Sequence, residues 1–309
     1  MHVVFGTGAI GSTLAARLYA DGRSVRVINR SGVAPTARGI EVCRGDASDV
    51  EACVRLADGA EVVYQCLNPP YHRWTEFPQL QRNVVAAAGR AGARVVAMDN
   101  LYAYGAPGNE PFTEKHPLVP CSRKGRIRAA MSEELFAAHD AGRVQATAAR
   151  ASDYFGPGAA SQSLIGSRVV PAALEGGVAQ VVGDLDQLHS FAYVPDIAAT
   201  LAMLGARDDA LGAVWHVPHA PPVTIREMVS MVYAAAGTTP RMRTLSRPIV
   251  TLIGLFNPTV RELREMLYQF DQPFVVDDRR VRELTGLEPT PLDQAVQATV
   301  DWWRLKAME

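Results

Sequence analysis

The sequence predicts a doubly wound α/β fold, in which helices cover both faces of a parallel sheet and a smaller lobe follows. Short β-rich segments alternate with helical patterns through the first half of the 309 residues. The segment 3–5, for example, precedes a helix with Ile10, Leu14 and Leu18 on one face. Such alternation requires crossover connections, so the strands are parallel and a ligand site is expected at their carboxyl ends.

The later elements of the first half continue this alternation. Asp49 is a favourable N-cap residue and Pro78 suits a first helical turn, so each marks a helix start. A further helix is expected near 124–141. We expect residues 1–155 to form one domain, completed by about 190–217. Its remaining strands are expected at 25–28, 40–42, 61–66, 94–98 and 144–149.

The alternation weakens after a Gly/Pro-rich turn that follows the first domain. Thr224 and Glu227 have the spacing of a capping box, and Pro291 begins a closing helix. These patterns predict that residues 156–189 and 218–309 form a smaller, mostly helical substrate-binding lobe.

The composition excludes several classes of partner. With 31 Lys and Arg residues against 32 Asp and Glu, the net charge of -1 provides no field that would attract nucleic acid or an anionic membrane. The apolar run 249–256 is far shorter than the roughly 20 residues of a membrane span. The four cysteines form no CxxC pair, and Met1 leads directly into an apolar run. We expect a cytoplasmic protein with a small-molecule substrate, and the sequence leaves a homodimer open.

A glycine-rich turn, Gly6-Thr7-Gly8-Ala9-Ile10-Gly11, joins the first strand to the first helix. Gly6 permits the tight turn, Gly8 lets the backbone approach a pyrophosphate, and Gly11 allows the helix to pack closely on the strand. The N–H groups at the helix start would face the phosphates. The segment therefore predicts a dinucleotide site, and the alternative is a turn that binds nothing.

The end of the second strand reads Asn29-Arg30-Ser31. A site for NAD usually places a carboxylate here, whereas an arginine accommodates the 2′-phosphate of NADP. Arg30 and Ser31 could bind that phosphate by charge-assisted hydrogen bonds. NADP is therefore favoured over NAD, unless Arg30 is simply a solvated residue at a strand end.

Several motifs together resemble the extended short-chain dehydrogenases/reductases, also called the NAD-dependent epimerase/dehydratase family. The resemblance covers nearly the whole chain. Its motifs are the glycine turn, Gly45-Asp46, Tyr104-Gly105, Tyr154-Phe155-Gly156-Pro157-Gly158, Phe191-Ala192-Tyr193-Val194-Pro195-Asp196 and Leu284-Thr285-Gly286-Leu287-Glu288-Pro289.

This resemblance implies a Rossmann domain that binds NAD(P), with chemistry in the cleft between it and the C-terminal lobe. Asp46 and Ala47 would contact the adenine. Leu67 and Asn68, at the end of the fourth strand, would lie along the nicotinamide. The turn departs from the family spacing because Phe5 occupies the first glycine position, and Gly6 follows one residue later.

The catalytic positions depart further. Family members usually carry a Tyr-x-x-x-Lys pair on the fifth helix and a Ser or Thr after the fifth strand. Lys124 stands at the tyrosine position, Arg128 at the lysine position and Asn100 at the serine position. The usual proton relay is therefore absent, and dehydrogenase activity cannot simply be carried over.

The substituted residues could still perform chemistry, because residues four apart share one helix face. Burial and neighbouring positive charge would lower the pKa of Lys124 from about 10.4 towards that of a useful general acid. Arg128 would be a fixed charge or substrate anchor, and Asn100 could donate a hydrogen bond to a developing anion. The alternative places Lys124 and Arg128 on a solvated basic helix start.

Tyrosines offer another source of the proton. Tyr71, Tyr102 and Tyr154 lie in segments that the resemblance places near the cleft, although each could simply be a packing residue. Asp153 and His189 are also expected on the substrate side. His189 stands where nucleotide-sugar enzymes of the family often carry a phosphate-binding arginine, which argues against such a substrate.

Three functions follow from these residues. The first is an NADP-dependent reductase of a small carbonyl or imine compound, with Lys124 as the proton donor. The second is a cofactor-binding protein without hydride transfer, either a regulator or a non-redox cyclase or isomerase. The third is a nucleotide-sugar epimerase or dehydratase. No metal is expected, since His216 and His219 lack a carboxylate or cysteine at ligand spacing.

Overall fold

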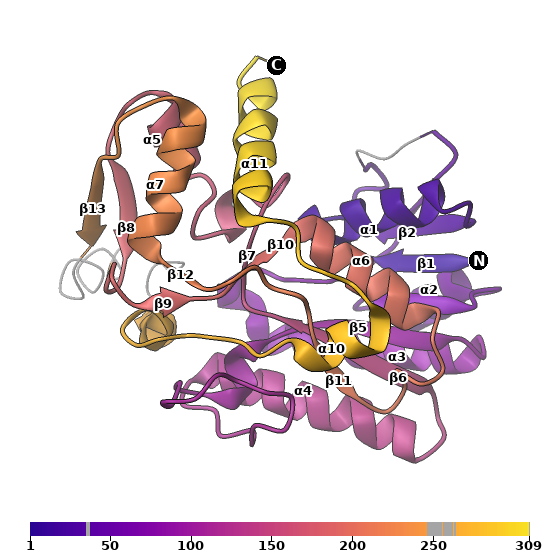
Figure 1. The fold of residues 1–309 in the computed structure, drawn as a ribbon. Coiled ribbons are helices and arrows are strands. Elements are labelled where there is room, and N and C mark those ends of the chain that lie inside the picture. The colour runs from indigo at the N-terminus through magenta and orange to yellow at the C-terminus, as the bar shows by residue number, and fades with distance from the viewer. Residues whose placement is uncertain (35–37, 246–254, 256–261, 263, 309) are drawn as a thin grey trace.

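A seven-stranded parallel sheet forms the centre of the molecule (Figure 1). The computed structural model describes residues 1–34, 38–245, 255, 262 and 264–308. The sheet contains β1 (His2–Phe5), β2 (Val25–Asn29), β3 (Glu41–Arg44), β4 (Val62–Gln65), β5 (Arg94–Asn100), β6 (Gln145–Ala151) and β11 (Val214–His216). Their order is β11-β6-β5-β4-β1-β2-β3, and every neighbouring pair is parallel. The predicted doubly wound sheet is confirmed.

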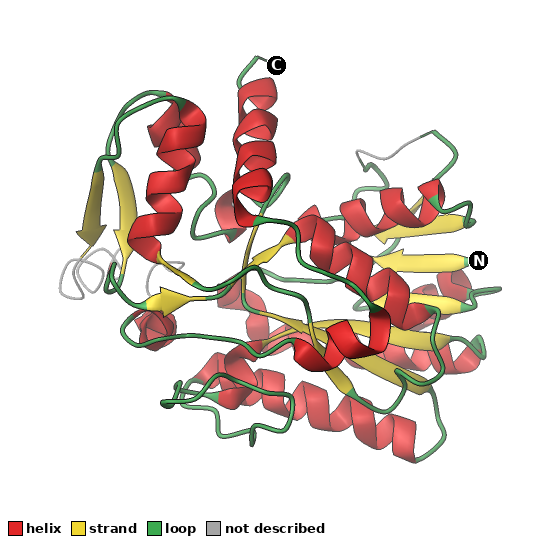
Figure 2. Cartoon of the chain, viewed as in Figure 1, coloured by secondary structure: helices red, strands yellow, loops and turns green. Residues whose placement is uncertain are grey.

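Helices cover both faces of this sheet (Figure 2). The helices α1 (Ala9–Ala20) and α6 (Val194–Gly205) bury Leu14 and Leu201 against one face. The other face is covered by α2 (Val50–Ala57), α3 (Phe77–Arg90) and α4 (Arg123–Asp140), which bury Cys53, Val84 and Leu135. Apolar burial on both faces is what holds the three layers together.

The helix starts follow from local chemistry. Asp49 accepts a hydrogen bond from the Ala52 N–H and begins α2, while Pro78 lies in the first turn of α3, as predicted. Ser122 begins α4 because its hydroxyl accepts a hydrogen bond from the Gly125 N–H. This cap fixes the helix that carries both basic residues of the predicted site.

The C-terminal part forms the smaller lobe at the left of Figure 1. Its helices are α5 (Val170–Leu174), α7 (Ile225–Ala236) and α11 (Leu292–Lys306), and the predicted capping box of Thr224 and Glu227 begins α7. Short strand pairs accompany these helices: β8 (Ala179–Val182) with β13 (Met242–Leu245), β9 (Leu188–His189) with β12 (Val223–Thr224), and β7 (Asp153–Phe155) with β10 (Phe191–Tyr193). Helix α10 (Arg279–Thr285) packs back against the core of the first domain.

Four 3₁₀ helices complete the described structure: η1 (Tyr71–Glu76), η2 (Leu101–Tyr104), η3 (Ala160–Gln162) and η4 (Arg264–Phe270). All four contribute residues to the cavity described below. The apolar run 249–256 lies outside the described residues except at residue 255. Within the described parts of the chain, no helix is long and apolar enough to span a membrane.

Candidate active site

A cavity of about 710 Å³ lies at the carboxyl ends of the parallel strands. It opens beside β1 and β4, where the strand order reverses, which is the usual ligand position of a doubly wound sheet. The second lobe closes its far wall with residues that include Arg168, Met266 and Phe270. The cavity therefore has a sheet side and a lobe side.

The glycine turn fits a dinucleotide. Gly6 has a φ of +100°, and a Cβ there would lie 2.7 Å from the carbonyl oxygen of Cys66. A Cβ on Gly11 would lie 1.9 Å from the carbonyl oxygen of Gly6. A Cβ on Gly8 would meet no atom within 4 Å, and Gly8 lines the cavity. Gly6 and Gly11 hold the turn together, while Gly8 leaves space for a phosphate at the start of α1.

Most of the predicted cofactor residues lie along this cavity. Its wall includes Gly6, Gly8, Ala9, Ile10, Asn29, Arg30, Asp46, Ala47, Leu67 and Asn68. Gly11 and Ser31 do not line it. The Ser31 hydroxyl donates to Asn29 Oδ1 and the Val33 carbonyl, so it supports the loop after β2. Of the two residues predicted to bind the 2′-phosphate, Arg30 lines the cavity and Ser31 does not.

Sequence reasoning missed Arg73 and Glu76 at the same end of the cavity. Their side chains pair, with Arg73 Nη2 2.6 Å from Glu76 Oε2. Asp46 lies nearby, and the hydrogen bond from the Ser48 N–H lowers the pKa of its carboxyl group. Arg30 and Arg73 both belong to the electrostatic surroundings of Asp46, so this end of the cavity carries charges of both signs.

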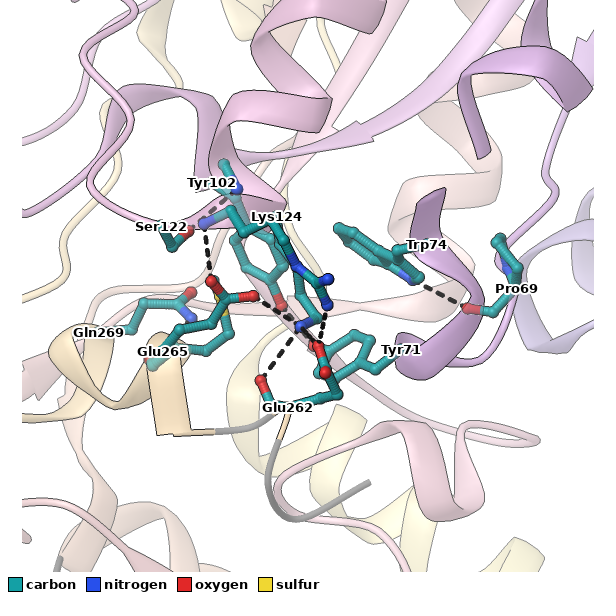
Figure 3. Close-up of polar contacts among 12 residues, drawn as sticks. Pro69, Tyr71, Trp74, Tyr102, Ser122, Lys124, Glu262, Glu265 and Gln269 are labelled. Atoms are coloured by element: carbon teal, nitrogen blue, oxygen red, sulfur yellow. Dashed lines mark hydrogen bonds and ion pairs between the residues drawn. The ribbon is translucent and has the colours of Figure 1, made fainter. Parts of the chain in front are cut away.

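Lys124 is not among the residues that line the cavity. Its side chain is fully buried, which excludes a solvated helix start. Its ammonium donates to Glu262 Oε2 at 2.5 Å and to Glu265 Oε1 at 2.7 Å (Figure 3). These two carboxylates come from beyond residue 260, so no pattern near α4 could reveal them. They neutralise the Lys124 ammonium behind the cavity wall.

Arg128 does line the cavity, although it sits on the same helix. Its guanidinium lies 4.4 Å from the Phe77 ring centroid, and Nη1 is 3.5 Å from Asp99 Oδ1. Asp99 also holds the buried Arg150 at 2.8 Å. Burial lowers the pKa of Arg128, and its Nε has no hydrogen-bond partner among the described residues. The residue is thus a fixed, incompletely satisfied cation beside the cavity.

A pair of tyrosine hydroxyl groups forms part of the same wall. Tyr71 and Tyr102 lie with their hydroxyl oxygens 2.7 Å apart, and both residues line the cavity. Trp74 packs beside both rings. Burial raises the pKa of Tyr71 to about 12 and that of Tyr102 well above its usual value. Both phenols therefore stay protonated at neutral pH.

Local sequence features explain the short helices that carry the two tyrosines, but they do not explain why the two hydroxyl groups meet. Tyr71 follows Pro70 at the start of η1, and Tyr102 belongs to η2, whose cap is Asn100. Asn100 lines the cavity, and its Oδ1 accepts a hydrogen bond from the Tyr102 N–H at 3.2 Å. The Lys124 ammonium lies 5.1 Å from the Tyr71 ring centroid (Figure 3). Lys124 thus contacts the ring of Tyr71, which is a residue of the cavity wall.

The predicted substrate residues divide between the wall and its support. Asp153 and Tyr154 line the cavity, and the Tyr154 hydroxyl donates to Gln162 at 2.8 Å. His189 is buried behind the wall, with Nε2 2.8 Å from Asp153 Oδ2. His189 therefore contacts the cavity through Asp153.

His216 and His219 lie apart from the cavity. His216 Nε2 is 2.9 Å from the Tyr104 hydroxyl oxygen, and Nδ1 is 2.8 Å from the Asp277 carbonyl oxygen. The His219 N–H donates to Asp278. Through these contacts both histidines join the first domain to the segment that precedes α10.

Comparisons with known proteins agree with this architecture. The sequence profile of the NAD dependent epimerase/dehydratase family matches residues 2–217. A dTDP-6-deoxy-L-talose 4-dehydrogenase (NAD(P)(+)) from Kitasatospora kifunensis is 28% identical over 255 residues, which is 76% of this chain and 78% of that protein.

Solved structures share the fold over almost the full length. A dTDP-glucose 4,6-dehydratase from Streptomyces venezuelae, solved with NAD bound, has a TM-score of 0.81 and 20% identity, covering 100% of this chain and 98% of its own. An epimerase from Methanothermobacter thermautotrophicus has a TM-score of 0.83 and 17% identity, and the match covers 99% of this chain and 93% of the epimerase.

The family match spans well over half of the chain, so the protein belongs to the NAD-dependent epimerase/dehydratase family. It is an enzyme of the short-chain dehydrogenase/reductase type.

Proposed function

We propose that this protein is an NADP-dependent oxidoreductase that interconverts a carbonyl or imine group and its reduced form on a small polar substrate. The observation that carries the proposal is the Tyr71–Tyr102 hydroxyl pair, which lies in the wall of the same cavity as the glycine turn. When bound, the nicotinamide cofactor supplies or accepts the hydride. The chain supplies binding, orientation and the proton.

Cofactor binding rests on three groups. The open space at Gly8 and the start of α1 suit a pyrophosphate. Arg30 is the candidate for the 2′-phosphate, since the end of β2 carries no carboxylate. Asp46 lies on the adenine side, and the relative from Kitasatospora kifunensis, named for NAD(P)(+), supports a site for either cofactor. The preference for NADP rests on Arg30 alone.

The proton comes from the tyrosine pair in this proposal. Tyr102 would donate its phenolic proton to the substrate oxygen or nitrogen as hydride arrives, and Tyr71 would donate to Tyr102 in turn. Burial raises the pKa of Tyr71, and the positive charge of Arg128 acts in the opposite direction. Arg128 would therefore stabilise the negative charge that develops on the pair. Lys124 is a positioning residue that packs against the Tyr71 ring.

A nucleotide sugar is a second candidate substrate. The named relative acts on a dTDP-sugar, and Arg168 is an exposed residue of the cavity wall that could bind a phosphate. In that case the tyrosine pair would serve a keto group on the sugar ring. A protein that binds the cofactor without hydride transfer is the remaining alternative, which the ion pairs of Lys124 with Glu262 and Glu265 support.

The test is consumption of NADPH, and of NADH in parallel, against ketones, aldehydes, imines and keto-sugar nucleotides. We expect Tyr102→Phe to lower kcat/KM by about 10²-fold or more, because it removes the donor and retains the ring. Tyr19→Phe on the exposed side of α1 is the matched control. Full activity in Tyr102→Phe would exclude the tyrosine pair as the proton donor.

Cofactor preference is read in the same assay from Arg30→Ala. We expect weaker binding of NADPH and unchanged binding of NADH, because only NADPH carries the 2′-phosphate. Equal losses for the two cofactors would contradict the role of Arg30. Tight binding of NADPH without turnover of any compound would favour the non-redox alternative.

A further inference from the structure

Asp153 is an unusual carboxylate in this cavity because its neighbour is a histidine. The residue follows β6 and begins β7, which pairs with β10. Its Oδ2 lies 2.8 Å from His189 Nε2, and its side chain remains 20% exposed. One oxygen is therefore held, and the carboxylate still lines the cavity.

Aromatic rings fix His189 in this position. Its ring stacks on Phe274 with centroids 5.3 Å apart and on Phe270 at 5.5 Å, while Phe191 lies at 4.9 Å. The strand β9 that carries it pairs with β12. These contacts hold the His189 ring in one orientation, with Nε2 directed at Asp153. The ring therefore orients the Asp153 carboxylate.

The other carboxylates of the cavity wall have different partners. Asp99 is held by Arg150 and Arg128, and Glu76 is held by Arg73. Asp46 accepts a hydrogen bond from the Ser48 N–H. Among the described residues, Asp153 makes no ion pair with lysine or arginine. Asp46 also lacks such a pair, but Arg30 and Arg73 lie in its electrostatic surroundings. Asp153 is therefore the wall carboxylate best placed to attract a positive group on a ligand.

The surroundings of Asp153 also suit a cation. Tyr154, which is partly exposed, lines the same cavity, and aromatic faces attract ammonium groups. The cationic Arg128 is also on the wall, but it is engaged with Asp99 and with the Phe77 ring. Arg168 is exposed in the lobe side of the wall. A bound ammonium would therefore find its counter-charge at Asp153.

We propose that Asp153, oriented by His189, binds a protonated amine of the substrate, so that the reducible carbonyl belongs to an amino-bearing compound. The proposal rests on the oxidoreductase function proposed above and specifies its substrate class.

Aminoacetone and hydroxyacetone test this directly, because they differ in the amine and match in size. Binding to the NADPH complex is followed by cofactor fluorescence, and turnover by NADPH consumption. We expect the wild-type protein to prefer aminoacetone by tenfold or more in Kd. Asp153→Asn should abolish that preference while leaving NADPH binding unchanged. His189→Gln keeps a donor to Asp153 and should retain most of the preference.

Equal binding of the two probes by the wild-type protein, or no binding of either, overturns the amine proposal. A preference that survives Asp153→Asn overturns it as well. The two proposals fail separately: turnover of hydroxyacetone without amine preference leaves the oxidoreductase standing, whereas Asp153-dependent amine binding without NADPH consumption leaves only the amine site.

Discussion

At the scale of single residues, the two basic side chains of α4 separate although they lie on one helix face. Arg128 meets Asp99 and the cavity, whereas Lys124 meets Glu262 and Glu265. Helical spacing correctly predicts that both point to the same side of α4. It cannot tell which of them reaches the cavity, because the choice depends on carboxylates more than 130 residues away in the chain.

Lys124→Met tests this assignment. The change leaves Glu265 without its cation, while Glu262 keeps its ion pair with the exposed Arg123. We therefore expect the free energy of unfolding to fall by about 2 kcal/mol, below the ~3–5 kcal/mol that breaking a fully buried pair costs. Urea denaturation measures it. Combining Lys124→Met with Glu265→Gln should cost less than the sum of the single changes. An unchanged free energy of unfolding in Lys124→Met would contradict this assignment.

At the scale of elements, local patterns predict the first domain well. The glycine turn, the cap of α2 and the proline of α3 all act within a few residues, and each occurs where the sequence indicates. The segment η4 carries no such signal, and no local pattern brings η1 and η2 together. Tertiary contacts place Tyr71 beside Tyr102 and Glu265 beside Lys124, so the sequence could name the proposed proton-donating pair only as separate tyrosines.

The glycine turn gives a prediction for the junction of β1 and α1. Gly8 has a φ of -70° and free space around its Cβ position, so Gly8→Ala should preserve the Tm while obstructing the pyrophosphate. Gly11→Ala should lower stability by about 2 kcal/mol, because the added methyl group meets the Gly6 carbonyl. Thermal unfolding and NADPH titration separate the two effects. Equal cofactor affinity in Gly8→Ala would show that phosphate does not bind at this turn.

At the scale of the whole molecule, the second lobe completes the site and also joins the first domain through β10 and α10. The sequence indicates a helical lobe from its caps, but the strand pair β7 and β10 has only three residues in each strand. Pairing between such short segments is decided by what surrounds them, so periodicity could not predict it. The contact of Asp153 with His189 depends on that pairing.

Two buried histidines in this junction make stability depend on pH. Burial lowers the pKa of His216 to about 3 and that of His219 to about 4. Both stay neutral in the folded protein, where His216 Nδ1–H donates to Asp277 and Nε2 accepts from Tyr104. In the unfolded chain they bind protons below about pH 6.5. Their contribution is therefore fully present above that pH and is lost as the pH falls.

We expect each histidine to reduce the free energy of unfolding by about 2 kcal/mol between pH 7 and pH 5, since the unfolded chain alone gains the proton there. The measurement is urea denaturation at both pH values. It compares the wild-type protein with a double variant that combines His216→Asn and His219→Gln. The difference between the two proteins isolates the histidines from carboxylates that titrate nearby. His72→Gln, at an exposed position, is the control. An identical pH dependence in all three proteins would mean that His216 and His219 already bind protons in the folded state.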